Sequence, residues 1–314
     1  MTGPDPRVLV VGEALIDLIP APDGSLTPSP GGAPANVAAG LSRLGTRAVF
    51  AGTLSSDALG GLLRRRMTDA GVDLTHCGES DRPTALAVAS PQPHGTRYDF
   101  HHQDTATFRL TPRTDGLDGF STVYVGGLAA VVDPAAGAVL ATARAAARET
   151  VLAVDPNVRE DRSLDRAAVL RRLRELCELA HLVKASDEDM SLLWPGEAPE
   201  AACRRLAAGG RLAVLTLGAR GSVAFLPDGR PLRIPAVPVE VVDTIGAGDA
   251  FMAALLGGLA RFGRSPADLA PAAVLELLHR AATAAAAVCA QAGADLSGVR
   301  QSEVRQSAVR QSAV

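Results

Sequence analysis

The feature that most constrains the fold is a pattern that repeats along the chain. A short apolar run ends in glycine or a polar turn, and a segment with the periodicity of a helix follows it. "RVLVVG" (7–12), "TVYVGG" (122–127) and "HLVKAS" (181–186) are examples. Runs that are apolar throughout are typical of parallel strands buried on both faces. Further runs of this kind are 47–52, 150–157 and 212–218, with helices expected at 33–45, 60–71, 165–179 and 199–208 and two alanine-rich helices closing the chain. The pattern predicts an α/β fold: a doubly wound, mostly parallel sheet flanked by helices.

Two segments interrupt this alternation, at about 14–30 and 84–107. The second has short alternating runs and a Pro-Gly turn around Pro93–Gly95, which is typical of antiparallel strands. We expect the two segments to form a small β-sheet lid at the carboxyl ends of the parallel strands, where open α/β sheets bind ligands. One domain is expected over residues 1–298, and the repetitive tail 299–314 is assigned no function.

Charge and composition exclude several classes of partner. The net charge is −3 and no basic run is present, which argues against nucleic acid or an anionic membrane surface as a partner. The four cysteines form no C-x-x-C pair, so a disulfide framework or zinc site is not expected and a reducing cytosol fits best. Glu13 and Asp17 interrupt the apolar stretch 8–19, unlike a signal peptide. The run 281–290 is too short to cross a bilayer. A soluble, cytoplasmic protein is the expectation.

Common catalytic motifs are missing from the sequence. It contains no G-x-x-x-x-G-K-[ST], G-x-G-x-x-G, G-x-S-x-G or H-E-x-x-H, which excludes a P-loop and removes the fingerprints of several other enzyme classes. The adjacent pair His101 and His102 has no third candidate ligand nearby. Neighbouring residues on a strand point to opposite faces, so we expect surface or lid histidines rather than a metal site.

The segment "VVDTIGAGDAF" (241–251) places Asp249 where a buried helix begins. Asp249 could be a simple helix N-cap. Alternatively, Gly246, Ala247 and Gly248 present bare N–H groups to a phosphate while Asp249 binds a hydroxyl. Two other strand ends suit phosphoryl transfer: "TLGARGS" (216–222) offers a glycine turn, and "VKASDEDM" (183–190) offers acids.

Together with "GGAPANVAAGLSRLG" (31–45), these motifs occur in an order that resembles the ribokinase-like (PfkB) carbohydrate kinase family. The resemblance covers residues 7 to about 297. It implies the doubly wound fold with a β lid, and ATP-dependent phosphorylation of a sugar hydroxyl.

The resemblance also implies roles for individual positions. Asp249 matches the catalytic base, and Gly246, Ala247 and Gly248 match the anion hole. A helix N-terminus there would stabilise charge on the transferring phosphoryl group, and we expect it to keep Asp249 ionised. The sugar-binding positions are Asp17, Gly32, Asn36, Asn157, Arg159 and Asp249; the nucleotide positions are Ser186, Thr216, Gly218, Gly221 and Gly248; the monovalent-cation positions, for K⁺, are Asp243, Ile245, Gly293 and Ser297.

The sequence departs from the family pattern at two points. The N-x-x-E element that organises Mg²⁺ through water aligns with Ser186-x-x-Asp189, so the role falls to Asp189, with Asp187 or Glu188 as alternatives that share it. An Asn often found beside the adenine aligns near Ala282, which leaves the nucleotide preference open.

"GEALIDLIP", "GGAPANVA" and "DPNVR" are most similar to the fructokinases of this family, so D-fructose is the first expectation for the substrate. Ribose, nucleosides, phosphosugars and 2-keto-3-deoxygluconate are alternatives. His102 stands where kinases of that sugar acid tend to carry an arginine, which weakens the last of these. A non-catalytic sugar-binding regulatory protein is the alternative from another class. The resemblance is also compatible with a homodimer formed through the lid.

Overall fold

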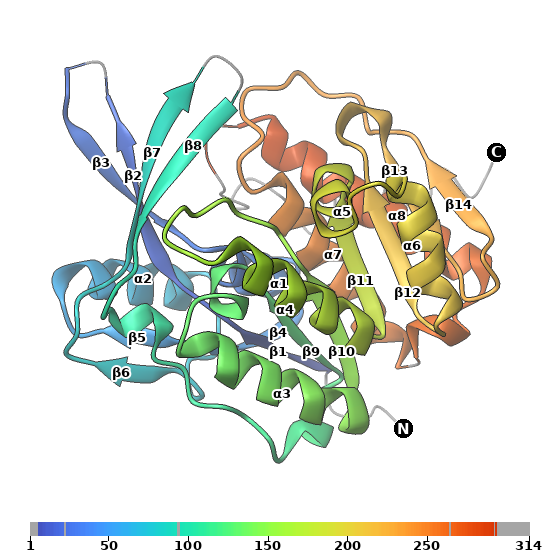
Figure 1. Cartoon of the computed structure of the whole chain (residues 1–314), viewed down its shortest axis with the longest axis horizontal. Helices are drawn as coiled ribbons and strands as arrows, with labels where there is room; N and C mark the ends of the chain where they lie inside the picture. Colours follow the sequence, from blue (N-terminus) through green and yellow to red (C-terminus); the bar gives the residue numbers. More distant parts are fainter. Residues whose placement is uncertain (1–5, 22, 93–94, 264, 292, 294–314) are drawn as a thin grey trace.

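The computed structural model describes residues 6–21, 23–92, 95–263, 265–291 and 293. Its centre is an eight-stranded sheet in the order β14-β13-β12-β11-β10-β9-β1-β4, parallel except for β13 and β14 (Figure 1). The predicted doubly wound α/β class is confirmed. The strands are β1 (Arg7–Val11), β4 (Arg47–Ala51), β9 (Thr122–Gly126), β10 (Val151–Asp155), β11 (Leu182–Ser186), β12 (Leu212–Thr216), β13 (Ser222–Phe225) and β14 (Pro231–Ile234).

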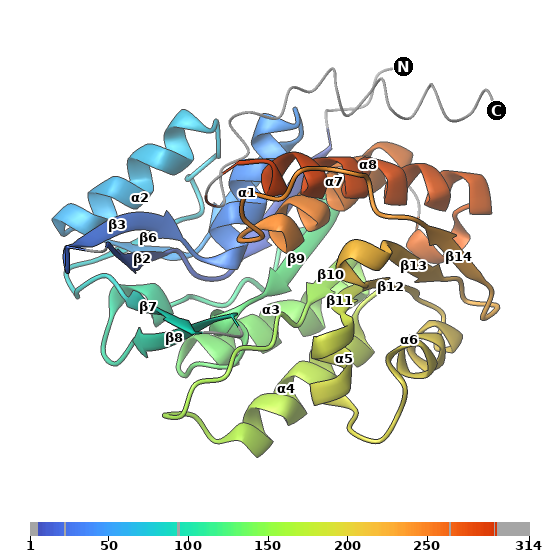
Figure 2. The same cartoon turned by 90° about the horizontal axis from the view of Figure 1, so that it is seen from above.

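Helices cover both faces of this sheet, so that three layers are seen from above (Figure 2). Side chains of β1 show why the strand is apolar throughout: Val8 and Val10 join one buried core, and Leu9 and Val11 join the other. The first face carries α1 (Ala33–Arg43), α2 (Ala58–Asp69), α7 (Ala247–Phe262) and α8 (Pro271–Cys289). The second carries α3 (Ala135–Glu149), α4 (Arg166–Leu179), α5 (Asp187–Leu193) and α6 (Pro199–Ala208).

A second, four-stranded sheet projects from one side of the main sheet, in the order β3-β2-β7-β8. This sheet is the predicted lid. Its strands are β2 (Leu15–Pro20), β3 (Leu26–Gly31), β7 (Leu86–Gln92) and β8 (Gly95–His101). β7 and β8 pair in antiparallel register, as predicted, while residues 93 and 94 of the turn between them lie outside the described residues. So does the tail 299–314.

The chain changes direction across the sheet beside β1. It passes from β1 to β4 on one side and later returns to β9 on the other. In doubly wound sheets such a reversal opens a crevice at the carboxyl ends of the strands, and ligands bind there. The lid strand β2 leaves the end of β1 directly, so the fold places the lid beside this crevice.

Helix α8 is long and apolar enough to cross a membrane by length and composition, with a mean hydropathy of 1.4. In this fold it packs along α7, and its side chains Leu277, Leu278 and Ala281 are buried in the first core. Packing inside the protein accounts for part of its apolar composition, since 39% of its most apolar window is buried.

Helix α2 packs closely against the end of β5 (Thr53–Ser55), a short strand that pairs with β6 (Gly78–Ser80). A Cβ at Gly60 would lie 2.1 Å from the backbone oxygen of Ser55, whereas one at Gly61 would meet only the flexible Arg65 side chain, at 3.4 Å. Gly60 is thus required by a backbone contact, and its neighbour is not.

We expect Gly60→Ala to lower the free energy of unfolding by about 1–3 kcal/mol, because the helix must shift away from Ser55. Gly61→Ala should raise it by up to about 1 kcal/mol, because alanine is the better helix former. Urea unfolding of the matched pair checks this. Equal effects of the two substitutions would contradict the close contact at Gly60.

Candidate active site

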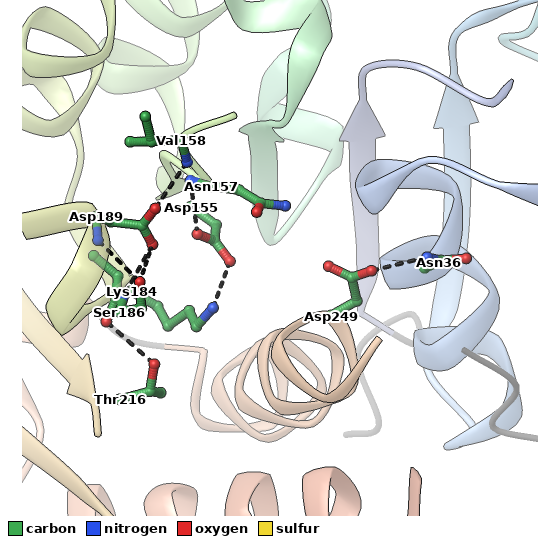
Figure 3. A network of polar contacts seen from close by, with 10 residues as sticks. Asn36, Asp155, Asn157, Val158, Lys184, Ser186, Asp189, Thr216 and Asp249 are labelled. Carbon is green, nitrogen blue, oxygen red and sulfur yellow. Dashed lines mark hydrogen bonds and ion pairs between the residues drawn. The ribbon is translucent and has the colours of Figure 1, made fainter. Parts of the chain in front are cut away.

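The first turn of α7 carries the predicted catalytic residue. Gly246 precedes the helix with a positive φ of 79°, which lets the chain turn sharply into it. Asp249 stands in that first turn, and its Oδ2 accepts a hydrogen bond from Nδ2 of Asn36, on α1, at 2.8 Å (Figure 3). Two residues 213 positions apart in the chain are thereby joined at the crevice.

We expected the N–H groups of Gly246, Ala247 and Gly248 all to be available to a phosphate, and the structure corrects this for Ala247. The N–H of Ala247 donates to the carbonyl of Thr244 at 3.2 Å, because residues 244–247 form the turn that leads into α7. This concerns Ala247 alone, and Gly246 and Gly248 remain candidates for binding the phosphate. A Cβ at Gly248 would lie 3.2 Å from Nζ of Lys184, so glycine here keeps the backbone close to a cation.

Lys184 was not predicted as a site residue. Its ammonium lies 2.8 Å from Oδ2 of Asp155; both side chains are buried, Lys184 in the middle of β11 and Asp155 at the end of β10. Burial by itself lowers the pKa of Lys184, but the Asp155 carboxylate outweighs it and the net shift is upward, so the lysine stays charged. Figure 3 shows this pair on one side of Asp249 and Asn36 on the other. The sequence did offer a sign: Lys184 is the sole lysine of the chain and stands within a largely apolar strand.

We expected the helix start to keep Asp249 ionised, and the burial of its carboxylate opposes this. Burial raises the pKa of Asp249, although the hydrogen bond from Asn36 and the charges of Lys184, Arg159 and Arg66 lower it in part. Loss of hydration therefore outweighs the favourable field. A carboxylate whose pKa is raised is a better proton acceptor than an ordinary aspartate.

The predicted sugar-binding residues of the amino-terminal part meet at the base of the lid. Asp17 lies on β2, directly over Gly31: a Cβ there would come within 2.0 Å of its Oδ2. Burial raises the pKa of Asp17 to about 6, and Arg159 and Arg66 lower it in part. Gly32 precedes α1 with a φ of 98°, and its Cα faces the carbonyl of Glu13.

Glu13 is a second buried residue that the sequence analysis did not select. Its carboxylate accepts the N–H groups of Leu128 and Ala129 at 3.1 and 2.9 Å, which ties β1 to the segment after β9 at the reversal point. Burial raises its pKa to about 7, although these N–H groups lower it in part. Glu13 directly follows the glycine that ends β1, and that was the signal available.

The other predicted sugar-binding residues lie in the loop after β10. Asn157 has a positive φ of 38°, and its N–H donates to Oδ1 of Asp155 at 3.2 Å; Asn tolerates this conformation better than most residues. Asp189 holds the next residue of the loop, because its Oδ1 accepts the N–H of Val158 at 2.8 Å. The charge of Arg159 lowers the pKa values of both Asp17 and Asp249, so the loop faces the crevice.

The nucleotide positions lie at the ends of β11 and β12. Ser186 caps α5 and forms a capping box with Asp189, whose Oδ2 accepts the N–H and hydroxyl of Ser186 at 2.9 and 2.7 Å. Thr216 donates to the carbonyl of Ala185 at 3.4 Å. Gly218 opens the turn to β13 with a φ of 57°. Gly221 ends this turn, and a Cβ there would lie 2.1 Å from the carbonyl of Ile234, so packing alone requires glycine.

The structure brings together three of the residues expected to bind a monovalent cation. Asp243 accepts the N–H of Ile245 at its Oδ1 and the N–H of Gly293 at its Oδ2, both at 3.0 Å. The loop before α7 and the segment after α8 therefore meet at this carboxylate. Ser297 lies outside the described residues.

The two histidines take different environments. His101 is exposed at the end of β8, whereas His102 is buried rather than on the surface. Nε2 of His102 lies 2.9 Å from Oδ2 of Asp161 and 3.0 Å from Oγ of Ser163, so it fastens the lid to the loop after β10. Within the described ranges no cluster of three or more His, Cys, Asp or Glu side chains could hold a metal.

Comparison with known proteins identifies the family. The profile described as "pfkB family carbohydrate kinase" matches residues 5–300. The chain belongs to this family. It is thus a carbohydrate kinase, a phosphotransferase, and the resemblance in the sequence motifs is confirmed.

Several fructokinases are similar along most of their length. The chain is 32% identical over 288 residues to the fructokinase of Escherichia coli, covering 87% of this chain and 91% of that one. It is 30% identical over 259 residues to that of Rhizobium leguminosarum bv. trifolii, with coverage of 80% and 79%. A crystal structure of fructokinase from Vibrio cholerae, with fructose, ADP and calcium bound, superposes with a TM-score of 0.82 at 25% identity, covering 96% of this chain and 98% of that one.

The buried ion pair gives a testable expectation for this kinase. Lys184→Met should lower the free energy of unfolding by about 3–5 kcal/mol, because Asp155 is left buried without its partner. Burial already raises the pKa of Asp155 to about 6, and without Lys184 it rises further. The folded protein then binds this proton more tightly than the unfolded chain, so the loss grows as the pH rises.

Urea unfolding at pH 5 and pH 8 measures this loss. The double variant Lys184→Met with Asp155→Asn should recover most of the stability, since neither charge of the pair remains. A single variant as stable as the wild type at pH 8 would contradict the pairing.

Proposed function

We propose that the protein transfers the γ-phosphate of ATP to a sugar hydroxyl, and that its substrate is D-fructose, giving fructose 6-phosphate. The observation that carries the proposal is the position of Asp249: it stands in the first turn of α7, held by Asn36 and backed by the Lys184 ammonium. A proton acceptor, polarised N–H groups and a cation are thus gathered at one end of the sheet.

The reaction follows from these groups. Asp249 orients the sugar hydroxyl and takes its proton as the oxygen attacks the γ-phosphorus. The new O–P bond forms while the bond from that phosphorus to the bridging oxygen of ADP breaks. The first-turn N–H groups of α7 and the nearby Lys184 charge stabilise the negative charge on the transferring group. Because the transition state is loose, positioning contributes more than basicity.

A divalent metal fits the site through the nucleotide rather than through a cage of side chains. Mg²⁺ commonly uses one or two carboxylates together with substrate phosphates and water. Both oxygens of Asp189 already accept hydrogen bonds from the protein, and Asp187 pairs with Arg220. Glu188 is exposed at the same strand end. We propose that Asp189 acts through water, with Glu188 as the acid that shares the role; the metal would neutralise charge on the phosphates.

We also propose that K⁺ binds at the loop before α7. The meeting of Asp243 with Ile245 and Gly293 supports this, with Ser297 as the further ligand suggested by the sequence. Such a cation would hold the loop that leads into Gly246, and through it the start of α7.

The comparisons favour fructose among the possible sugars. The curated relatives described above are fructokinases. Ribosides are the second candidate, because an aminoimidazole riboside kinase from Salmonella enterica superposes about equally well, with a TM-score of 0.81 at 26% identity and coverage of 96% and 99%. A sugar acid is disfavoured, because His102 is engaged with Asp161 and Ser163.

The first experiment is an ADP-release assay with Mg-ATP, with and without K⁺, on a panel of fructose, ribose, glucose, 2-keto-3-deoxygluconate, adenosine and two fructose phosphates. We expect turnover on fructose, stimulated by K⁺. Asp249→Asn should lower kcat by about 100-fold or more, since the proton acceptor is lost. Turnover on another sugar would overturn fructose alone. No turnover on any, with ATP and sugar still bound, would favour a non-catalytic sugar-binding protein.

We further propose that the enzyme is cytoplasmic and that it forms a homodimer through the lid. Ile19 on β2 and Leu26 on β3 are large apolar side chains that remain 43% and 49% exposed, and a second copy would cover them. Light scattering should give twice the chain mass of 32.2 kDa. Ile19→Asp should shift the population toward monomer, because it buries a charge at the contact. A monomeric wild type would contradict the proposal.

A further inference from the structure

Arg66, on α2, contacts the site from outside the set of residues that the sequence motifs supply. Its Nη1 donates to Oδ1 of Asn36 at 2.9 Å. The other end of that amide, Nδ2, donates to Oδ2 of Asp249 at 2.8 Å. A continuous path of two hydrogen bonds therefore joins α2, α1 and α7.

The donors and acceptors of these groups determine how the side-chain amide of Asn36 is oriented. A guanidinium has only donors, so it can meet only the oxygen end of the Asn36 amide. The NH₂ end must then face Asp249, and an ionised carboxylate can only accept. Without Arg66, the amide could turn its oxygen toward a protonated Asp249 instead. Arg66 thus selects the amide orientation that favours the ionised acid.

The same nitrogen of Arg66 also reaches the lid. Nη1 donates to the carbonyl of Pro30 at 2.9 Å, and Pro30 lies in lid strand β3, just before the glycine over which Asp17 packs. One guanidinium nitrogen therefore holds both the base of the lid and the partner of the catalytic acid.

We propose that Arg66 is a positioning residue: it orients Asp249 through Asn36, and it makes that orientation depend on lid strand β3 being in place. This inference rests on the proposed kinase function. It assigns to α2 a part in the reaction that a purely structural helix would not have.

Several charges act on Asp249, and they decide the sign of the pH effect. Arg66, Lys184 and Arg159 lower its pKa, as does the Asn36 hydrogen bond. The charges of acids on neighbouring elements oppose them; these acids are Glu13 after β1, Asp17 on β2 and Asp155 on β10, with the Tyr124 phenol of β9 nearby. Removing Arg66 should therefore raise the pKa of Asp249 further. Only the ionised form of Asp249 accepts the proton. The fall in activity toward low pH would therefore begin at a higher pH.

The test compares Arg66→Met with Arg65→Met, a neighbour on the same helix that is exposed and lies along Gly61. We expect Arg66→Met to lower kcat by about 10- to 100-fold, as misplacement of a reacting group does, and to move the acid limb of the kcat profile to higher pH. Arg65→Met should change neither. Arg66→Lys, which keeps the charge, should restore the acid limb more fully than it restores kcat.

A double variant separates positioning from folding. In the Asn36→Ala background, Arg66→Met should cost much less than it does in the wild type, because its path to Asp249 is already broken. Thermal unfolding of each variant reports any loss of folded protein, which by itself lowers kcat without moving the acid limb. An unmoved acid limb, or full additivity of the two substitutions, would overturn the inference. An inactive wild type would instead overturn the proposed function.

Discussion

Burial of carboxylates at the carboxyl edge of the parallel sheet is the constraint on which the rest of the structure depends. Glu13, Asp155 and Asp249 all lose hydration there, and burial raises the pKa of each. Such groups persist only with donors or cations beside them. The fold supplies these from separate elements: backbone N–H groups after β9 for Glu13, Lys184 for Asp155, and Asn36 for Asp249.

This arrangement gives the site two supports that differ in how deeply they are buried. On the main-sheet side, the Lys184–Asp155 pair and the Asp189 capping box are buried among strand ends. On the lid side, the link runs through Arg66, whose partner Pro30 belongs to a strand that projects away from the core. Asp249 lies between the two. Its surroundings therefore combine a buried framework with a link to the base of the lid.

Much of the architecture could be predicted, because strands buried on both faces are largely apolar and lid strands need not be. The predicted lid segments correspond to β2, β3, β7 and β8. The site was predicted less completely. Asp249 and Asn36 were selected as site residues, and the structure brings them into contact, but Lys184, Glu13 and Arg66 were not. Each of these three acts through a partner that is distant in the sequence. No pattern in the adjacent residues indicates which partner that is.

By itself, the sequence determined the class of fold, the family and the placement of Asp249 at a helix start, since all three depend on local patterns and ordered motifs. Only the tertiary structure decided the electrostatics of the site. The dipole at the start of α7 favours an ionised Asp249, yet its pKa is raised, because the loss of hydration depends on everything packed around the carboxylate. Local sequence specifies the dipole, whereas burial and the placement of Arg66, Lys184 and Arg159 are properties of the whole fold.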